Sequence, residues 1–263
     1  MMIVGKVAGY EIRDVIRSRW LVGYALFLFL LTDSLFRFGG GGDKALLSLV
    51  NVVLLLIPLV TLVFSTVYLY HAREFIELLL TQPIGRRQVY LGLYFGLSAP
   101  LSLSFATAVA IPFLIHRGLS SSQPGTFAAL LVVGVALTLV FVALALLIAA
   151  CTEDRIKGLG FAIALWLLMA VLYDGLVLLF VALMSDHSIE RPVLALMFAN
   201  PMDLARVALL LQFDVSALLG YTGAVLQKFF GRATGVTATL AALSAWVIIP
   251  LLTGMRAFQK KDF

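Results

Sequence analysis

Two stretches of this sequence have residue types suited to nucleotide binding or catalysis, and the first is a glycine-rich run. Four glycines at 39–42 precede Asp43 and Lys44, as they would in a phosphate-binding loop. Such a loop requires a lysine followed by Ser or Thr, and here Ala45 follows the lysine. A flexible turn is the favoured interpretation, so we do not expect this chain to hydrolyse ATP by itself.

The second stretch contains a serine, Ser98, in the run Gly96-Leu97-Ser98-Ala99. A serine nucleophile needs a histidine or another base within reach. The three histidines, His71, His116 and His187, fall at the edges of apolar runs or in loops. A His-Glu-x-x-His zinc helix is also missing from the sequence. The sequence therefore predicts a protein without catalytic residues.

Soft metal ligands gather in one place in the sequence: Met184, His187, Met197 and Met202. Thioether and imidazole groups suit Cu(I), but methionine more often serves as a flexible packing residue. We therefore favour packing, and assign no metal site. The single cysteine, Cys151, cannot form an intrachain disulfide and is interpreted as a small apolar filler.

Composition places the chain in a membrane. Hydrophobic residues make up 62% of the 263 positions and charged residues 13%, against about half and a quarter in soluble domains. A bilayer core about 30 Å thick needs roughly 20 apolar residues per helical span. Six runs qualify, which predicts an all-α protein with six transmembrane helices in a single domain, 1–263. The runs are 21–36, 45–70, 89–115, 127–151, 158–184 and 236–255.

The positions of the basic residues predict the orientation. Cytoplasmic loops carry an excess of Lys and Arg. If the N-terminus is cytoplasmic, twelve of the nineteen basic residues fall on that side. Both termini are therefore predicted to be cytoplasmic, and the net charge of +5 is assigned to topology, with no nucleic acid as partner. The twelve are Lys6, Arg13, Arg17, Arg19, Arg73, Arg86, Arg87, Arg155, Lys157, Arg256, Lys260 and Lys261.

Residues 1–19 are predicted to form an interfacial helix. Apolar side chains recur with helical spacing, while Lys6, Arg13 and Arg17 occupy the opposite side. We expect this helix to lie flat on the membrane and to turn into the first span at Trp20. The apolar stripe comprises Ile3, Val4, Val7, Ala8, Ile12, Val15 and Ile16.

The segment 71–88 is the longer cytoplasmic connection and reads HAREFIELLLTQPIGRRQ. Glu74 and Glu77 share one side at i and i+3, and Phe75, Leu78 and Leu79 share another. Pro83 and Gly85 should end this short amphipathic helix. Docking on a protein is the favoured interpretation, and a helix resting on lipid is the alternative.

The segment 185–235 is predicted to lie on the other side of the membrane. Asn200 can cap a helix that begins at Pro201, with Asp203 in its first turn. A second helix is expected over 215–230, ended by Gly231. Because each helix has one apolar face, we expect Asp203, Arg206 and Asp214 to remain available for docking a protein; a passive lid is the alternative.

One acidic residue, Asp174, falls in the middle of the fifth apolar run. An acidic group there costs about 2.5–3.5 kcal/mol on insertion scales, so a functional role is the default hypothesis. Asp174 either lines a substrate pathway or is protonated and bonded to a neighbouring helix. Asn51 and Asp33 are nearer the ends of their runs and are interpreted as contacts between helices.

Four stretches of the chain resemble the permease subunits of type-2 ABC transporters, the ABC-2 family. They are YEIRDVIRSRWL from Tyr10, ELLLTQPIGRRQVYLG from Glu77, LWLLMAVLYDGLVLL around Asp174 and NPMDLARVALL from Asn200. The likeness is closer to the branch that serves nitrous oxide reductase maturation, a copper-processing system. That branch usually has an acidic pair before its Leu-Leu-Leu-Thr run, whereas here the residues are Tyr70-His71-Ala72-Arg73-Glu74.

The resemblance implies a permease with a type V exporter-like fold in the bacterial inner membrane. It also implies a homodimer, two separate ATPase subunits that bind ATP and Mg, and an extracytoplasmic (periplasmic) partner. By this resemblance, the loop after the second span would be a coupling helix that contacts the ATPase, and residues 152–157 would make a second contact. The first contact would comprise Glu74, Phe75, Ile76, Glu77, Leu78, Leu79, Thr81, Gln82, Pro83, Arg86 and Arg87, and the second Glu153, Asp154, Arg155 and Lys157.

The sequence leaves two alternative functions open. The chain could instead be an ABC-2 exporter of another substrate, such as a lipid, a drug or a peptide, and the sequence does not choose among these substrates. An ion-coupled secondary transporter is disfavoured, because such carriers commonly show internal repeats and paired broken helices, and neither is visible here. A membrane scaffold that holds an extracytoplasmic partner overlaps with the permease interpretation.

Overall fold

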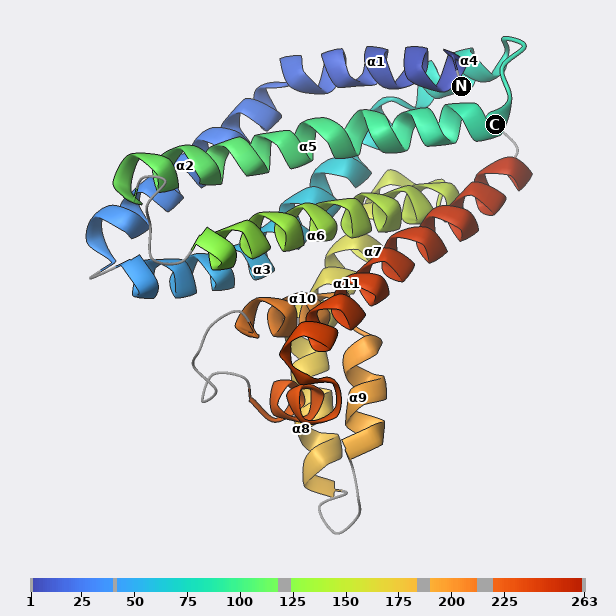
Figure 1. Cartoon of the computed structure of the whole chain (residues 1–263). Helices are drawn as coiled ribbons and strands as arrows, with labels where there is room; N and C mark the ends of the chain where they lie inside the picture. Colours follow the sequence, from blue (N-terminus) through green and yellow to red (C-terminus); the bar gives the residue numbers. More distant parts are fainter. Residues whose placement is uncertain (1, 40–41, 118–123, 184–189, 212–219, 262–263) are drawn as a thin grey trace.

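A computed structural model describes residues 2–39, 42–117, 124–183, 190–211 and 220–261. Every regular element in these ranges is a helix, as the apolar runs predict (Figure 1). The helices are α1 (Met2–Arg17), α2 (Arg19–Phe38), α3 (Gly42–His71), α4 (Arg73–Leu80), α5 (Arg86–Arg117), α6 (Pro124–Cys151), α7 (Arg155–Leu167), the π-helix η1 (Leu168–Leu172), α8 (Tyr173–Leu183), α9 (Glu190–Phe198), α10 (Pro201–Leu210) and α11 (Gly220–Lys260).

Six helices in the described part are long and apolar enough to cross a membrane, which confirms the prediction of six spans. The fifth is composite, because α7, η1 and α8 follow one another without a break from Arg155 to Leu183. Ser18 separates α1 from α2, since its extended backbone interrupts the helix and its hydroxyl oxygen accepts a hydrogen bond from the Trp20 amide. The spans are Arg19–Phe38, Lys44–His71, Arg86–His116, Gly125–Cys151, Arg155–Leu183 and Thr237–Lys260.

Helix α6 is the centre of the bundle. It packs against α3, α5 and α11, and 61% of its most apolar window is buried. Gly134 makes room for the ring of Phe105 from α5, because any side chain there would collide with that ring. At the end of the bundle near the start of α6, Phe113 and Phe127 stack with ring centroids 3.6 Å apart. These contacts fix α5 against α6.

Helix α1 lies along α5, so the prediction of a helix lying flat on lipid is corrected (Figure 1). Val7, Ala8 and Val15 are buried by protein. Gly92 and Gly96 of α5 allow this close approach: a Cβ on Gly92 would lie 2.6 Å from Cγ1 of Val7, and a Cβ on Gly96 would collide with Glu11. The basic side remains exposed, as predicted, at Lys6, Arg13 and Arg17.

The predicted helix at Pro201 is confirmed as α10, with Asn200 as its N-cap. The predicted helix end at Gly231 is wrong, because α11 continues from Gly220 to Lys260. A glycine inside a helix costs only about 1 kcal/mol, which the long apolar helix tolerates. Helices α9 and α10 are bent by 104° relative to each other. Asp214 and the start of the predicted helix over 215–230 lie outside the described residues.

Candidate functional site

The short amphipathic helix predicted within 71–88 is present as α4, Arg73–Leu80, and it ends before Pro83 as expected. Its two faces differ sharply in burial. Ile76 is 5% exposed and packs into the core, whereas Leu78 is 57% exposed. The assignment of Ile76 to the partner contact is therefore corrected, because its side chain already packs within this chain. Leu79 also packs partly against the core, which leaves Glu74 and Leu78 on the outer face.

Two other residues of the predicted contact have partners within the chain. The ring of Phe75 stacks on Tyr10 of α1, with centroids 4.8 Å apart. Glu77 accepts a hydrogen bond of 2.9 Å from Nε of Arg73, one turn earlier on the same helix. Phe75 therefore also positions α4 against α1, and Glu77 holds the Arg73 side chain within α4.

The turn after α4 exposes Thr81, Gln82 and Pro83, and Arg87 is exposed at the start of α5. Arg86 behaves differently. It is half-buried, and its Nη1 donates hydrogen bonds to the carbonyl oxygens of Gln259 at 3.0 Å and Lys261 at 2.6 Å. The Arg86 guanidinium therefore holds the residues at the end of α11, and its docking role stays a prediction.

The second predicted contact is the loop between α6 and α7. Asp154 caps α7, with Oδ1 accepting hydrogen bonds from the amides of Ile156 at 2.7 Å and Lys157 at 3.3 Å. Glu153, Arg155 and Lys157 are exposed, as predicted. Sequence reasoning missed Ile156, whose side chain is 81% exposed. Its apolar character next to three charged residues was the available signal.

The structure brings these two loops together, although about eighty residues separate them in the sequence. The Tyr70 hydroxyl lies 2.5 Å from Oγ1 of Thr152, and Nη1 of Arg73 donates to the Glu153 carbonyl at 3.3 Å. Gly158 provides the space for the Tyr70 ring, since a Cβ at that position would collide with it. The two segments therefore form one face of the protein. Leu78 of α4 and Ile156 at the start of α7 are exposed on it.

A second polar region connects α8 to α10. Nη1 of Arg206 donates to Oδ2 of Asp174 at 2.8 Å and lies 3.3 Å from Oδ1 of Asp203. Of the two roles considered for Asp174, the structure shows a bond to a neighbouring helix. The expectation that Asp203 stays available for docking is corrected, because the residue is 5% exposed and turned into the protein. Arg206 is half-buried in the same cluster.

Asn200 joins this region to the π-helix η1. A π-helix leaves backbone groups without their usual partners. The Nδ2 group of Asn200 donates to the Met169 carbonyl at 2.9 Å, while its Oδ1 accepts from the Met202 amide at 3.0 Å. Asn200 is 1% exposed, so both bonds are shielded from solvent. Tyr173 adds a bond from its hydroxyl to the Leu196 carbonyl at 2.5 Å.

The methionines considered as copper ligands are core residues where the structure describes them. Met197 and Met202 are 0% and 3% exposed, which supports packing. Met184 and His187 lie outside the described residues. Among the residues described, no group of three His, Cys, Asp or Glu side chains could hold a metal ion. Cys151 is exposed at the end of α6, so it does not fill the core as expected.

Asp33 is the remaining polar residue that the sequence assigned to contacts between helices, and it makes one. Its Oδ1 lies 2.8 Å from Nε2 of His116 at the end of α5, and Arg37 lies 3.4 Å from its other oxygen. Asn51, by contrast, is exposed on α3. Asp33 therefore joins α2 to α5, in agreement with the prediction.

A buried carboxyl on α1 was not found from the sequence. Glu11 is 0% exposed, and the Tyr68 hydroxyl lies 2.5 Å from its Oε2 and 2.8 Å from Oδ2 of Asp14. Burial raises the pKa of Glu11, and the nearby Asp14 charge adds to the increase while the Tyr68 bond opposes it. One phenol proton cannot serve two carboxylates, so a protonated Glu11 fits this geometry.

Six apolar spans and a short amphipathic helix after the second span define a multi-pass membrane protein. The chain belongs to the ABC-2 family transporter proteins, whose family match covers residues 6–263. It is similar over its whole length to two proteins described as "Probable ABC transporter permease protein NosY". The one from Pseudomonas aeruginosa is 27% identical with 99% of each chain covered, and the one from Stutzerimonas stutzeri is 26% identical with 98% of each covered.

Proposed function

We propose that α4 and the α6–α7 loop form one docking surface for a separate ATPase subunit. The observation that carries this proposal is the joining of the two loops through Tyr70, Arg73 and Thr152, with Leu78 and Ile156 exposed beside them. Large apolar side chains surrounded by charged residues are typical of protein contacts. A rigid pair of loops would transmit movement of the ATPase into several spans together.

In this proposal, the permease performs no chemistry, and ATP and Mg are bound by the partner. Two copies of the chain pair with two ATPase subunits, as the ABC permease family implies. The docking surface faces the cytoplasm, and both termini lie on that side. This orientation follows from the twelve basic residues that the terminal segments and the short loops would place there. The membrane is the bacterial inner membrane.

We further propose that the energy is used on an extracytoplasmic partner in copper-site maturation of nitrous oxide reductase. The full-length similarity to two permeases named NosY supports this branch of the family. The region from α9 to the start of α11 would meet the partner. Within α10, the buried Asp203 cannot serve as the contact, so we assign the contact to the exposed residues of α9, Pro192 and Ala195.

Coupling can be tested by copurification of the ATPase with the full-length chain. We expect the double variant Leu78→Asp, Ile156→Asp to lose at least ten-fold in ATPase recovery, because a buried unpaired charge at each loop opposes docking. Membrane insertion should be unchanged, since both side chains lie outside the six spans or at their edge. Recovery of the ATPase is measured by quantitative blotting against the permease.

The matched control is Leu78→Met, Ile156→Met, which keeps the exposed apolar surface at both positions. We expect normal recovery of the ATPase with this control. Full recovery with the aspartate variant, in membranes that contain normal amounts of the permease, would contradict the assignment of this surface.

A further inference from the structure

Helix α11 is one continuous helix from Gly220 to Lys260, and it is attached to the rest of the chain at two distant levels. Figure 1 shows it running from the end of the bundle that carries α4 to the region of α9 and α10. We call the attachment at Lys261, which follows the helix, the inner attachment, and the attachment at Trp246 the outer attachment. About 20 Å of helix lies between them.

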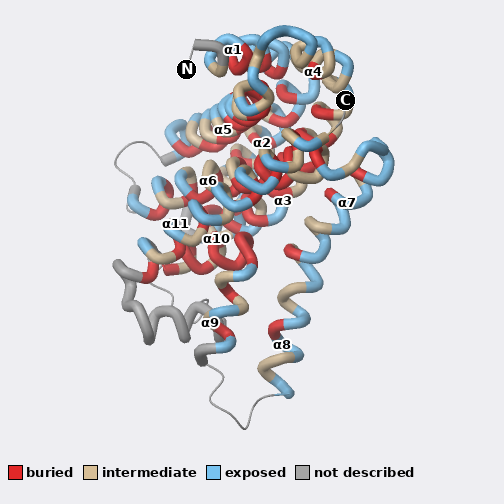
Figure 2. The backbone as a smooth tube through the Cα atoms, turned by 90° about the vertical axis from the view of Figure 1, so that its right-hand side faces the viewer, coloured by how far each residue is buried: buried red, intermediate tan, exposed pale blue. Residues whose placement is uncertain are grey.

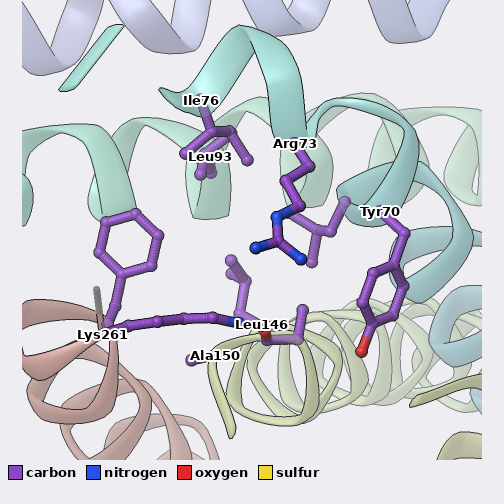
Figure 3. Close-up of a pocket in the computed structure, with 10 residues that line it drawn as sticks. Tyr70, Arg73, Ile76, Leu93, Leu146, Ala150 and Lys261 are labelled. Atoms are coloured by element: carbon purple, nitrogen blue, oxygen red, sulfur yellow. Dashed lines mark hydrogen bonds between the residues drawn. The ribbon is translucent and has the colours of Figure 1, made fainter. Parts of the chain in front are cut away.

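The inner attachment joins α11 to both segments of the docking surface. Nζ of Lys261 donates hydrogen bonds to the carbonyl oxygens of Ala149 at 3.0 Å and Thr152 at 3.1 Å. Thr152 is also the residue that the Tyr70 hydroxyl contacts, just before α4 begins. Figure 3 shows Lys261 extending along α6 into the pocket that Arg73 of α4 also lines. Lys261 therefore lies where α4 and the α6–α7 loop meet.

Close packing holds the inner part of α11 against α5 and α6. The ring of Phe258 packs on Tyr90 of α5, with ring centroids 5.4 Å apart. A Cβ on Gly254 would lie 3.1 Å from Cα of Leu147 and would collide with the Tyr90 hydroxyl, so the glycine allows this approach. Pro250 lies farther along α11, and the helix continues through it. Close packing leaves this part of α11 little room to bend on its own.

The outer attachment joins α11 to α9 and α10. Nε1 of Trp246 donates a hydrogen bond to the Phe198 carbonyl at 3.1 Å, beside the bend between the two short helices. Leu243 is 1% exposed and packs in one hydrophobic cluster with Met197 of α9 and Leu204 of α10. The outer part of α11 is therefore fixed to the segment to which we assign the extracytoplasmic contact.

We propose that α11 couples the position of the docking surface to the position of α9 and α10, with Lys261 and Trp246 as its two positioning residues. Coupling between distant sites is carried by packed side chains, hydrogen bonds and helices, and α11 provides all three. Such coupling is reciprocal, so a change at either attachment must alter the other. The inference rests on the proposed function only for the ATPase that would move the docking surface, since the coupling itself belongs to this chain.

The test is hydrogen exchange, measured by mass spectrometry on the purified full-length chain in lipid nanodiscs without ATPase. Two peptides report on the two attachments. The inner peptide covers 148–158, where the Thr152 amide donates a backbone hydrogen bond of 2.9 Å. The outer peptide covers 196–204, where the Leu204 amide donates one of 3.1 Å. Loosening of either attachment should speed the exchange of such amides.

Each attachment is loosened by one substitution. Lys261→Met removes the ammonium donor and keeps an unbranched side chain, and Trp246→Phe removes the indole donor to the Phe198 carbonyl. For each variant we expect faster exchange in the near peptide and exchange faster by about five-fold or more in the distant peptide. A residue that only stabilises its own surroundings would change the near peptide alone.

The matched controls are Lys260→Met and Ser244→Ala, which alter α11 beside the two attachments. Lys260 is exposed, and the exposed Ser244 hydroxyl donates to the Leu240 carbonyl of the same helix at 2.9 Å. We expect both controls to leave the distant peptide unchanged. An unchanged distant peptide in Lys261→Met and in Trp246→Phe would overturn the proposal, because α11 would then hold two independent contacts. An effect in one direction only would overturn it as well.

A second variant covers the case in which Lys261→Met fails to fold. Arg86→Gln loosens the inner attachment through the carbonyl oxygens of Gln259 and Lys261, and the same faster exchange in the outer peptide is expected. Copurification of the ATPase is scored separately. Its absence from the natural chain would contradict the proposed function, whereas the exchange result alone decides whether α11 couples its two attachments.

Discussion

Two spans of similar length and apolar character occupy very different positions in this molecule. Helix α6 lies at the centre, and 61% of its most apolar window is buried. The composite span α7–η1–α8 lies at the edge, where 17% of the corresponding window is buried (Figure 2). Hydropathy identifies both as spans. It does not distinguish a central helix from a peripheral one, because lipid and protein are equally apolar neighbours.

The two spans are also held by different interactions. Helix α6 is fixed by close packing, in which Gly134 accepts the ring of Phe105. The peripheral span is fixed by polar contacts: Trp166 donates to the Leu55 carbonyl at 3.2 Å, and Asn200 and Arg206 bond to η1 and α8. Its exposed leucines, such as Leu178 and Leu179, must be covered by lipid or by a second copy of the chain.

The largest effect is expected from a leucine at the central glycine. Gly134→Leu should lower the free energy of unfolding by about 3 kcal/mol, because the Phe105 ring occupies the space that the new side chain needs. Gly175→Leu in α8 is the matched control, since nothing lies within 4 Å of a Cβ at that position. Its expected change is within about 0.5 kcal/mol. The free energies of unfolding of both variants are measured by reversible unfolding with SDS in mixed micelles.

An equally large loss for Gly175→Leu would change the comparison. It would mean that α8 is covered by another protein surface in the assembled permease. Chemical crosslinking between cysteines on α8 of two copies would then identify that surface as the interface of a dimer.

A medium effect is expected at the polar connection to the peripheral span. Asn200→Ala removes the cap of α10 and the donor to the Met169 carbonyl, so we expect a loss of about 2 kcal/mol. Asn51→Ala is the control, because Asn51 is exposed on α3, and about 0.5 kcal/mol or less is expected. The same unfolding assay applies. Equal stability of the two variants would show that η1 does not depend on Asn200.

The smallest effect concerns Glu11, a buried carboxyl on the side of the bundle where α1 packs against α5. Burial raises the pKa of Glu11, so the folded state holds its proton more tightly than the unfolded state does. The associated stability is complete below the ordinary carboxyl pKa, about 4, and is lost as the pH rises through the raised pKa. Glu11→Gln keeps a neutral group there. The variant should therefore match the natural chain at low pH and become more stable than it as the pH rises.

The measurement is the unfolding midpoint of both proteins across the pH range from 4 to 8. Asp14→Asn is a useful comparison, since Asp14 is exposed and contributes to the raised pKa of Glu11 through its charge. Removing that charge should reduce the pH dependence of the natural chain. A natural chain whose stability increases over this range, relative to Glu11→Gln, would contradict the assignment of a protonated Glu11.

Features that depend on local pattern could be predicted from the sequence. The six spans follow from runs of apolar residues, and the short amphipathic helix, expected within 71–88 and found as Arg73–Leu80, follows from its spacing and from Pro83. The Asn200 cap follows from Asn-Pro at a helix start. Each of these signals involves residues within a few positions of one another.

Features that depend on distant partners could not be predicted in the same way. Ile76 turns inward because Leu69 and Leu93 surround it, and Arg86 bonds to the end of the chain. Asp203 is covered because α10 packs against α6 and α11. Gly92 and Gly96 face a helix about eighty residues earlier in the sequence. A sequence pattern contains no record of such neighbours when the two segments are far apart.

The resting place of α1 on α5 has a consequence for biosynthesis. Residues Gly92 and Gly96 leave the ribosome about eighty residues after Val7 and Glu11, which at 5–20 residues per second corresponds to roughly 5 to 15 s. During that interval the α5 surface that covers the apolar stripe of α1 does not yet exist, so we expect α1 to lie at the lipid surface. The amphipathic pattern of α1 therefore suits contact with lipid while the chain is being synthesised. The glycines of α5 allow the helix to pack against protein after the third span has been inserted.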